Sequence, residues 1–386
     1  MYNENIAGEL RLRWNKILNL MKEQSVEALL VATTSNLFYT SSKVFSGYTY
    51  FSTSKQEPTF FVKRPVGLEG ENVVYIRKVE DIANFISPSE NVALELDTLP
   101  YGEVTRYAKV FGEAKLINGS HILRVSRSVK TDYELNLIRL SGEKHTASYA
   151  EFKSLYRPNI TDIEFSIEAE RIMRKNGSLG LFRIAGSSME IFFGSVIVGE
   201  NADNPSPYDF AMGGEGQNSS LPVGANGTTL KEGQTMMVDL GGNFTGYMTD
   251  MTRTYCLGEV SELARKAHQV SCDIAAKFEV MAQEGVAACD MFNMAQQTAE
   301  EAGLSQYFMG HKQKAGFVGH GVGIEINELP VLAPRSRDLL KKGMVVALEP
   351  KFVIPEVGAV GIENTYIITE TGVEKVTNAP EALEIF

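Results

Sequence analysis

The sequence predicts a mixed α/β (α+β) protein with two domains, on three observations. The chain has 386 residues, which is enough for two domains of about 100–200 residues each. Residues 1–120 alternate helical spacing with short apolar runs, as a small α/β unit does. Residues 316–386 are rich in strand-like runs. We therefore expect an α/β domain at residues 1–125 and a second domain at residues 130–386.

The N-terminal domain is expected to begin with a helix and to continue as a sheet. Leu10–Gln24 has apolar residues at helical spacing, and the run VEALLVAT at 26–33 has the pattern of a buried strand. Four further runs are strand candidates, each bounded by Gly, Pro, Asn or Asp: YTYFST, PTFFVK, NVVYIR and NVALEL. This domain shows no cluster of reactive side chains of its own.

A linker and two capped helices are expected where the second domain begins. The segment HILRVSRSVKTDYE at 121–134 reads as a linker. Thr131–Glu134 and Thr161–Glu164 both fit the capping box T-x-x-E, in which each side chain caps a backbone N–H group. They predict one helix to about Leu155 and another that ends near Asn176–Gly177.

A long loop is expected next, at residues 195–233, because this stretch is rich in Gly, Asn, Ser and Pro. Within a compact domain, such a stretch is typical of a lid or binding loop, and a plain surface excursion fits it equally well. Val260–Gly285 and Asp290–Gly303 have amphipathic spacing and predict two helices.

Composition and charge exclude several classes of function. The net charge is −11 with no basic cluster to offset it, which argues against a nucleic acid or an anionic membrane as partner. The three cysteines form neither a C-x-x-C pair nor a disulfide ladder, as expected for a reducing, cytoplasmic setting. We see no apolar signal segment and no run of about 20 apolar residues that could cross a membrane.

Five side chains in short, glycine-marked stretches carry the chemistry. These are Asp239, Asp250, His320, Glu349 and Glu363. Taken singly, each has an ordinary explanation as a turn, surface or core residue. Together, four carboxylates would repel one another strongly unless cations lay between them. Hard oxygen ligands with one imidazole suit Mn, Co, Zn or Fe, so the sequence predicts a metal site.

The spacing allows two strand pairs to bring the carboxylates together. Gly241, Gly242 and Gly246 lie between the two aspartates, which permits an antiparallel pair. A second pair is expected between the two glutamates, whose intervening segment contains prolines and glycines. His320 lies between Gly319 and Gly321, so the backbone can approach closely there.

The series D-x-G, G-Y-x-x-D-x-T-R-T, G-H-G-V-G, E-P and E-N-T resembles the M24 metallopeptidase family, which contains aminopeptidase P, prolidase, methionine aminopeptidase and creatinase. The resemblance covers residues 130–386 and implies the pita-bread fold, while the N-terminal domain resembles that of creatinase. It implies two divalent metal ions, one held by Asp239, the other by His320 and Glu349, with Asp250 and Glu363 bridging both. It further implies a small peptide substrate and a homodimer.

The chemistry implied by the resemblance is hydrolysis of an Xaa-Pro amide bond, as an aminopeptidase or dipeptidase. A hydroxide bridging two metals would attack the carbonyl, and the metals would take up the developing negative charge. Glu349 would carry the proton to the leaving amine.

The sequence departs from the family at its substrate-orienting positions. One family histidine corresponds to Asn327, whose amide could still donate a hydrogen bond. Another corresponds to Ser206 or to Val223, and the two alignments stay open. A frequent family arginine corresponds to Gly361. Loss of a donor to the oxyanion lowers the rate by about 10²–10³.

Several other polar residues near these motifs have ordinary interpretations. His311 is expected in an exposed loop, and His268 in a helix as a structural residue. Arg253 fits either support of a ligand carboxylate or a surface ion pair. Glu325 and Glu328 are expected to face solvent, with a role in a pocket as the alternative.

Three hypotheses for the function follow. The first is an Xaa-Pro aminopeptidase or dipeptidase, which the five ligands favour. The second is an enzyme of the same fold that breaks another C–N or C–X bond, as creatinase and a sulfur-compound lyase of the family do, which the replaced histidines favour. The third is a non-catalytic metal-binding or peptide-binding module, which loss of the ligands would have favoured.

Overall fold

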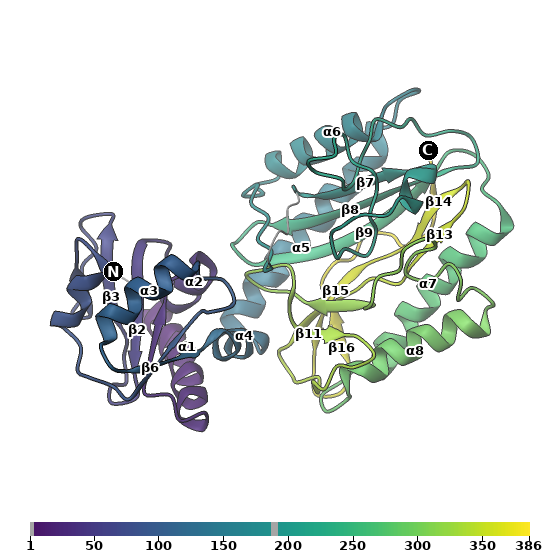
Figure 1. The fold of residues 1–386 in the computed structure, drawn as a ribbon. Helices are drawn as coiled ribbons and strands as arrows, with labels where there is room; N and C mark the ends of the chain where they lie inside the picture. The colour runs from purple at the N-terminus through teal and green to yellow at the C-terminus, as the bar shows by residue number, and fades with distance from the viewer. Residues whose placement is uncertain (1–3, 187–191) are drawn as a thin grey trace. The chain divides into compact units, whose positions relative to one another are not determined.

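The structure, a computed structural model, describes residues 4–186 and 192–386. The chain forms two compact units, Met1–Arg127 and Ser128–Phe386 (Figure 1). The elements of the first unit are α1 (Glu4–Glu23), β1 (Ala28–Val31), α2 (Thr34–Ser41), β2 (Ser46–Ser52), β3 (Thr59–Arg64), β4 (Val73–Tyr75), η1 (Val79–Asn84), β5 (Asn91–Leu94), α3 (Tyr101–Phe111), β6 (Lys115–Asn118) and α4 (Ser120–Ser128).

The first unit is built on one six-stranded mixed sheet, in the order β4-β3-β2-β1-β5-β6. Strand β1 pairs antiparallel with β2 and parallel with β5. The predicted α/β class of this unit is confirmed, as are its first helix and five strands. The predicted linker at 121–134 is wrong in its first part, because Ser120–Ser128 forms helix α4. The short helices α2 and α3 and the strand β6 were not predicted.

In the described residues, the second unit combines mostly antiparallel strands with four long helices. Its elements are α5 (Asp132–Phe152), η2 (Lys153–Leu155), α6 (Asp162–Lys175), β7 (Gly194–Val198), η3 (Gly199–Asp203), β8 (Thr235–Asn243), β9 (Met248–Cys256), α7 (Glu262–Met281), α8 (Ala288–Glu301), β10 (Gly319–Gly321), β11 (Glu328–Leu332), β12 (Val345–Leu348), β13 (Lys351–Ile354), β14 (Gly358–Gly361), β15 (Asn364–Ile368), β16 (Val373–Lys375) and β17 (Glu384–Ile385).

Both predicted capping boxes are present and open the first two helices of this unit. The Thr131 side chain accepts from the Glu134 N–H group, and the Thr161 side chain accepts from the Glu164 N–H group. In each box the glutamate side chain caps the threonine N–H group in return. The predicted loop at 195–233 is wrong in its first residues, since Gly194–Val198 forms the fully buried strand β7.

The strands lie between two helical layers (Figure 1). Helices α5 and α6 contact strands β7, β8 and β9, whereas α7 contacts β13 and β14, and α8 contacts β11. Buried apolar side chains join each layer to its strands, with Phe152 and Phe165 in one cluster and Phe278 and Phe352 in another. The strands are therefore covered on both sides, and the carboxylates between them lie deep in the unit.

Candidate metal site

The first strand pair brings two aspartates to one face. Strands β8 and β9 are antiparallel, with Asp239 opposite Thr252 and Gly241 opposite Asp250. Because side chains alternate along a strand, the two aspartates are diagonal neighbours on the same face. This arrangement is the one predicted from the glycine-marked spacing.

Two strand pairs meet at the two glutamates. Leu348 of β12 pairs with Asn364 of β15, and Lys351 of β13 pairs with Gly361 of β14. Glu349 and Glu363 occupy the junction between these two pairings. A single antiparallel bridge from Thr252 to Glu363 then ties this junction to strand β9. The expected second strand pair is thus present.

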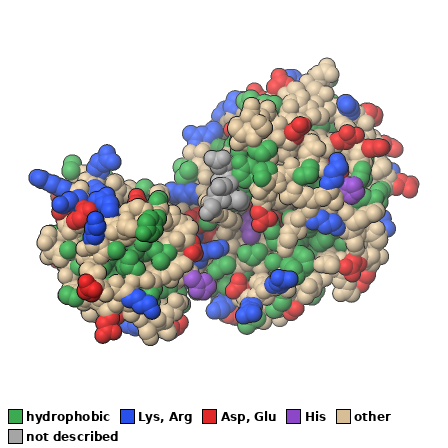
Figure 2. Space-filling view, in the orientation of Figure 1, with side chains coloured by type: hydrophobic (Ala, Val, Ile, Leu, Met, Phe, Trp, Pro, Cys, Tyr) green, Lys and Arg blue, Asp and Glu red, His purple; other side chains and the backbone are tan. Residues whose placement is uncertain are grey.

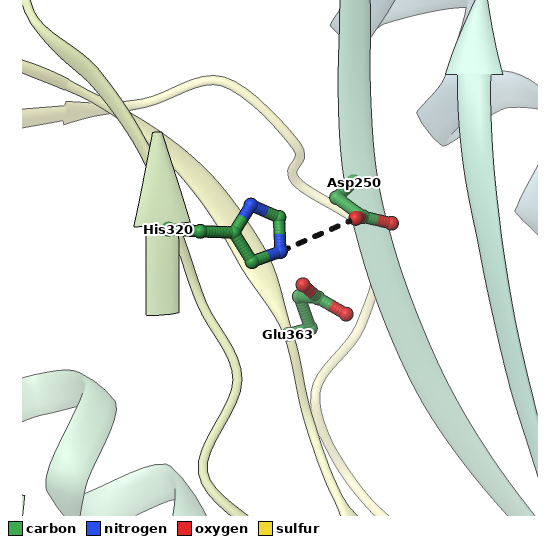
Figure 3. A group of neighbouring side chains, drawn as sticks. All are labelled: Asp250, His320 and Glu363. Carbon is green, nitrogen blue, oxygen red and sulfur yellow. Dashed lines mark ion pairs between the residues drawn. The ribbon is translucent and has the colours of Figure 1, made fainter. Parts of the chain in front are cut away.

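His320 enters from strand β10, which pairs with β11 and β12. Its glycine neighbours are needed for close approach. A Cβ at Gly319 would lie 2.3 Å from the Ala347 carbonyl oxygen, and one at Gly321 would lie 2.1 Å from that of Leu329. Figure 3 shows the imidazole pointing from strand β10 toward Asp250 and Glu363.

Asp250, His320 and Glu363 form a group of potential metal ligands. Their ligand atoms all lie within 4.8 Å of one another. The His320 Nε2 atom is 3.8 Å from an Asp250 carboxylate oxygen and 3.4 Å from Glu349 Oε1. Glu363 Oε1 is fully buried and has no hydrogen-bond partner among residues 4–186 and 192–386. A buried carboxylate oxygen without a partner is what a cation at this point would satisfy.

A second group consists of Asp239, Glu349 and Glu363, and a lysine holds it. The Lys351 Nζ atom donates to Asp239 Oδ2 at 2.8 Å, to Glu349 Oε2 at 2.7 Å and to Glu363 Oε2 at 3.1 Å. The Lys351 side chain has no solvent exposure. Sequence reasoning missed this residue, although a lysine two positions after a ligand, within the apolar run VVALEPKFVI, was a usable signal.

Burial and neighbouring charge set the protonation of the group. Burial raises the pKa of Asp250 well above its usual value, and the nearby carboxylates add to the shift. Burial also raises the pKa of Glu363 to about 8. Burial has the same tendency at Glu349, but Lys351 and His320 outweigh it and hold that pKa at about 2. Burial lowers the pKa of His320, yet the contact with Glu349 raises it overall.

These residues fit one divalent cation better than two. The Asp250–His320–Glu363 group offers an imidazole and two carboxylates, and one oxygen of the Glu363 carboxylate has no partner in the described residues. The Asp239–Glu349–Glu363 group already has an ammonium at hydrogen-bonding distance from all three carboxylates. The two cations expected from the resemblance therefore do not fit the arrangement as it stands.

The residues at the family's histidine positions have local partners. Asn327 accepts from the Ala185 N–H group at 2.8 Å and donates to the Ala185 carbonyl at 2.7 Å, so its amide fastens the neighbouring segment. Ser206 donates to the Pro222 carbonyl at 2.8 Å, and Val223 is buried and apolar. Neither alignment therefore supplies an imidazole at the position of the family histidine. In the first alignment, the Ser206 hydroxyl is already bonded within the loop.

Arg253 neither pairs with a ligand carboxylate nor forms a surface ion pair, the two roles predicted for it. Its guanidinium is buried and donates to carbonyl oxygens, including that of Glu363 at 2.8 Å, and to the Asn364 amide oxygen. It therefore fixes the backbone that carries Glu363 rather than a carboxylate. Glu328 also differs from the prediction, because it is buried against Lys130 at 3.0 Å. The expectations for two histidines are met: His268 is buried in α7, and the partly exposed His311 contacts Asp203.

"Metallopeptidase family M24" matches residues 136–370, and "Creatinase/Prolidase N-terminal domain" matches residues 13–129. The chain belongs to metallopeptidase family M24. The fold is accordingly the pita-bread fold, preceded by a creatinase-type domain.

Similar proteins span nearly the whole chain. The Xaa-Pro dipeptidase of Pyrococcus furiosus is 25% identical over 97% of this chain and 100% of its own length. The structure of an Xaa-Pro dipeptidase from Bacillus anthracis superposes with a TM-score of 0.80 at 25% identity, covering 97% of this chain and 99% of that one. The prolidase from Pyrococcus horikoshii OT3 has the same fold, with a TM-score of 0.78 at 21% identity over 96% of this chain and 99% of that one.

Two surface observations bear on partners. On the face of the second unit in Figure 2, acidic side chains lie interspersed with basic ones. None of the helices in the described residues is both long and apolar enough to span a membrane.

Proposed function

We propose that this M24 family member is a metal-dependent peptidase that hydrolyses Xaa-Pro bonds in small peptides, as a dipeptidase or an aminopeptidase. One observation carries the proposal. The side chains of Asp250, His320 and Glu363 lie together, and the buried Oε1 atom of Glu363 has no hydrogen-bond partner in the described residues. The similarity to Xaa-Pro dipeptidases along almost the full length supports the substrate class. Mn, Co, Zn and Fe all suit this ligand set.

His320 is oriented to present one nitrogen to a cation. Its Nδ1 atom lies 3.2 Å from the Gly321 carbonyl oxygen, to which only a protonated nitrogen can donate. A proton therefore belongs on Nδ1, which leaves Nε2, the nitrogen that faces Asp250 and Glu349, as the one that would bind a cation. A divalent cation held there would polarise a scissile carbonyl and make a water molecule more acidic.

Glu349 is the proposed proton carrier between the attacking water and the leaving amine. A pKa of about 2 keeps its carboxylate ionised at neutral pH, so it can accept a proton.

The second candidate is a non-peptide C–N or C–X bond cleavage on the same fold, as in creatinase or a lyase. The replaced histidine position favours it, because the Asn327 amide is bonded to the Ala185 backbone instead of being directed at a substrate. Gly361, where relatives often have arginine, offers no side chain for substrate contact either.

The test is a substrate panel with metal-loaded protein. Xaa-Pro dipeptides report dipeptidase activity, Xaa-Pro tripeptides report aminopeptidase activity, and creatine represents the second candidate. Release of proline from dipeptides that is lost in Glu349→Gln supports the proposal. Activity that persists in Glu349→Gln would point to a contaminating peptidase, and turnover of creatine alone would favour the second candidate.

A cytoplasmic location and a homodimer also belong to this proposal. The three cysteines, Cys256, Cys272 and Cys289, are all free thiols, which suits a reducing compartment. The homodimer rests on the family resemblance, and light scattering of the purified protein tests it.

A further inference from the structure

We infer that Lys351 takes the place of one of the two expected cations, so that the site binds a single divalent metal ion between Asp250, His320 and Glu363. The inference rests on the proposed metal-dependent function and specifies its cofactor. It also assigns a role to a residue that the metal-ligand pattern does not include.

The contacts of Lys351 are those of a bound cation. Its ammonium group has three N–H donors, and three carboxylates accept from it at 2.7–3.1 Å. No donor is left for a substrate, and the side chain is fully buried. Lys351 is therefore a positioning residue that holds three carboxylates in place, and it is not aimed at a reacting group.

The two oxygens of Glu363 show how the site is divided. Oε2 accepts from Lys351 at 3.1 Å and from the Thr252 hydroxyl at 2.8 Å. Oε1 has no hydrogen-bond partner in the part of the chain that the structure describes. The carboxylate thus bridges an ammonium on one side and an open ligand position on the other, where a two-metal site would have a metal ion on each side.

The grouping of the ligands agrees with this division. Among the described residues, the groups of close ligand atoms are Asp250–His320–Glu363 and Asp239–Glu349–Glu363. Neither contains both aspartates. Glu363 is the residue that the two groups share, and Asp250 belongs to the open group alone.

The balance of charge favours the same conclusion. When all four carboxylates are ionised, as metal ligation requires, the one ammonium leaves enough negative charge for a divalent ion in the open group. A second divalent ion beside Asp239 would have to share Asp239, Glu349 and Glu363 with an ammonium that is already bonded to each. Like charges at such short range repel strongly in a buried site.

The register of the hairpin explains how the lysine fits. Lys351 of β13 lies opposite Gly361 of β14, which has no side chain. A Cβ at Gly361 would lie 2.6 Å from the Pro350 carbonyl oxygen and 3.1 Å from the Lys351 Cα atom. The pairing thus leaves no room for a side chain at Gly361 beside Lys351.

The experiment is a count of metal ions in the full-length protein. Wild type, Lys351→Ala and Lys130→Ala are loaded with Mn²⁺ or Zn²⁺, desalted and analysed by native mass spectrometry and elemental analysis. Lys130→Ala is the matched control, because Lys130 is also a buried lysine paired with a glutamate, Glu328, outside the metal-ligand groups. We expect one metal ion in the wild type and control and two in Lys351→Ala.

Two tightly bound metal ions in the wild type, or none, would overturn the inference, and so would a folded Lys351→Ala that binds only one. If Lys351→Ala does not fold, the wild type decides alone: electron paramagnetic resonance of the Mn²⁺ form should show an isolated ion, and a spin-coupled pair would refute the inference. Metal content and peptidase activity are separate readouts. An inactive protein with one metal ion contradicts only the proposed function, and an active one with two contradicts only this inference.

Discussion

Replacing Lys351 by methionine should destabilise the second unit strongly in the absence of metal. Methionine keeps most of the side-chain volume, so the change removes the charge without creating a large cavity. The buried Glu349 and Glu363 and the partly buried Asp239 then lose their common partner, which donates to them at 2.7–3.1 Å in the wild type. Breaking a buried ion pair from one side costs about 3–5 kcal/mol. For a unit of this size, each kcal/mol lowers the melting temperature by roughly 2–4 °C, so we expect a drop of roughly 10 °C.

The assay is thermal unfolding followed by circular dichroism in EDTA, with Lys130→Met as control. Lys130 contacts one carboxylate where Lys351 contacts three, so Lys130→Met should lower the melting temperature less.

The pH dependence of the melting temperature gives a second check on the cause. In the wild type the pKa of Glu349 is held near 2, below its unfolded value, so this contribution is present above about pH 4 and is lost as the pH falls toward 2. The difference between wild type and variant should therefore shrink at acid pH. Melting temperatures within roughly 2 °C of each other at pH 7 would refute the reasoning.

Three further predictions concern neighbouring residues. The pKa of Glu363 is about 8, above its unfolded value, so the metal-free protein should lose stability as the pH rises from about 5 to 8. Added Zn²⁺ should restore that stability. A melting temperature that stays constant or rises over this range in EDTA would contradict the shift. Arg253→Met leaves several buried carbonyl oxygens without a donor and should lower the free energy of unfolding by about 3 kcal/mol, whereas a loss below about 1 kcal/mol in urea titrations would count against its structural role. Asn327→Ala removes both hydrogen bonds to Ala185 and should speed amide exchange at Ala185 by roughly tenfold or more; unchanged exchange by mass spectrometry would show that Asn327 does not fasten this segment.

The sequence predicted the elements of the site that depend on local pattern. Asp239 and Asp250 could be placed on one strand pair because Gly246 marked the turn between them, although Gly241 and Gly242 lie within strand β8. The capping boxes at Thr131 and Thr161 marked helix starts by direct side-chain chemistry. The short helix α2 escaped because eight residues give little periodicity, and its N-terminal residue has no side-chain cap hydrogen bond. Helix α4 was mistaken for a linker because its polar residues masked the apolar face that the fold buries.

The role of Lys351 depended on tertiary structure. A lysine within a strand pattern normally faces solvent, and only the strand pairing reveals that this one faces the carboxylates. The partners of Arg253 and Glu328 were missed for the same reason, since each lies far away in the sequence. Residue type and spacing therefore identified which side chains could bind metal. Whether a lysine already occupies their oxygens depends on the strand pairing, which the sequence pattern did not reveal.

The charge of Lys351 does not depend on the supply of metal, because the lysine is part of the chain. A cation supplied by a side chain arrives with every newly made molecule, in fixed amount, and no chelator or shortage can withdraw it. Three of the four clustered carboxylates are thereby neutralised in part as soon as strands β8, β13 and the segment around Glu363 assemble. On the inference above, we expect the second unit to fold before its ion arrives, with the ion adding stability at neutral pH.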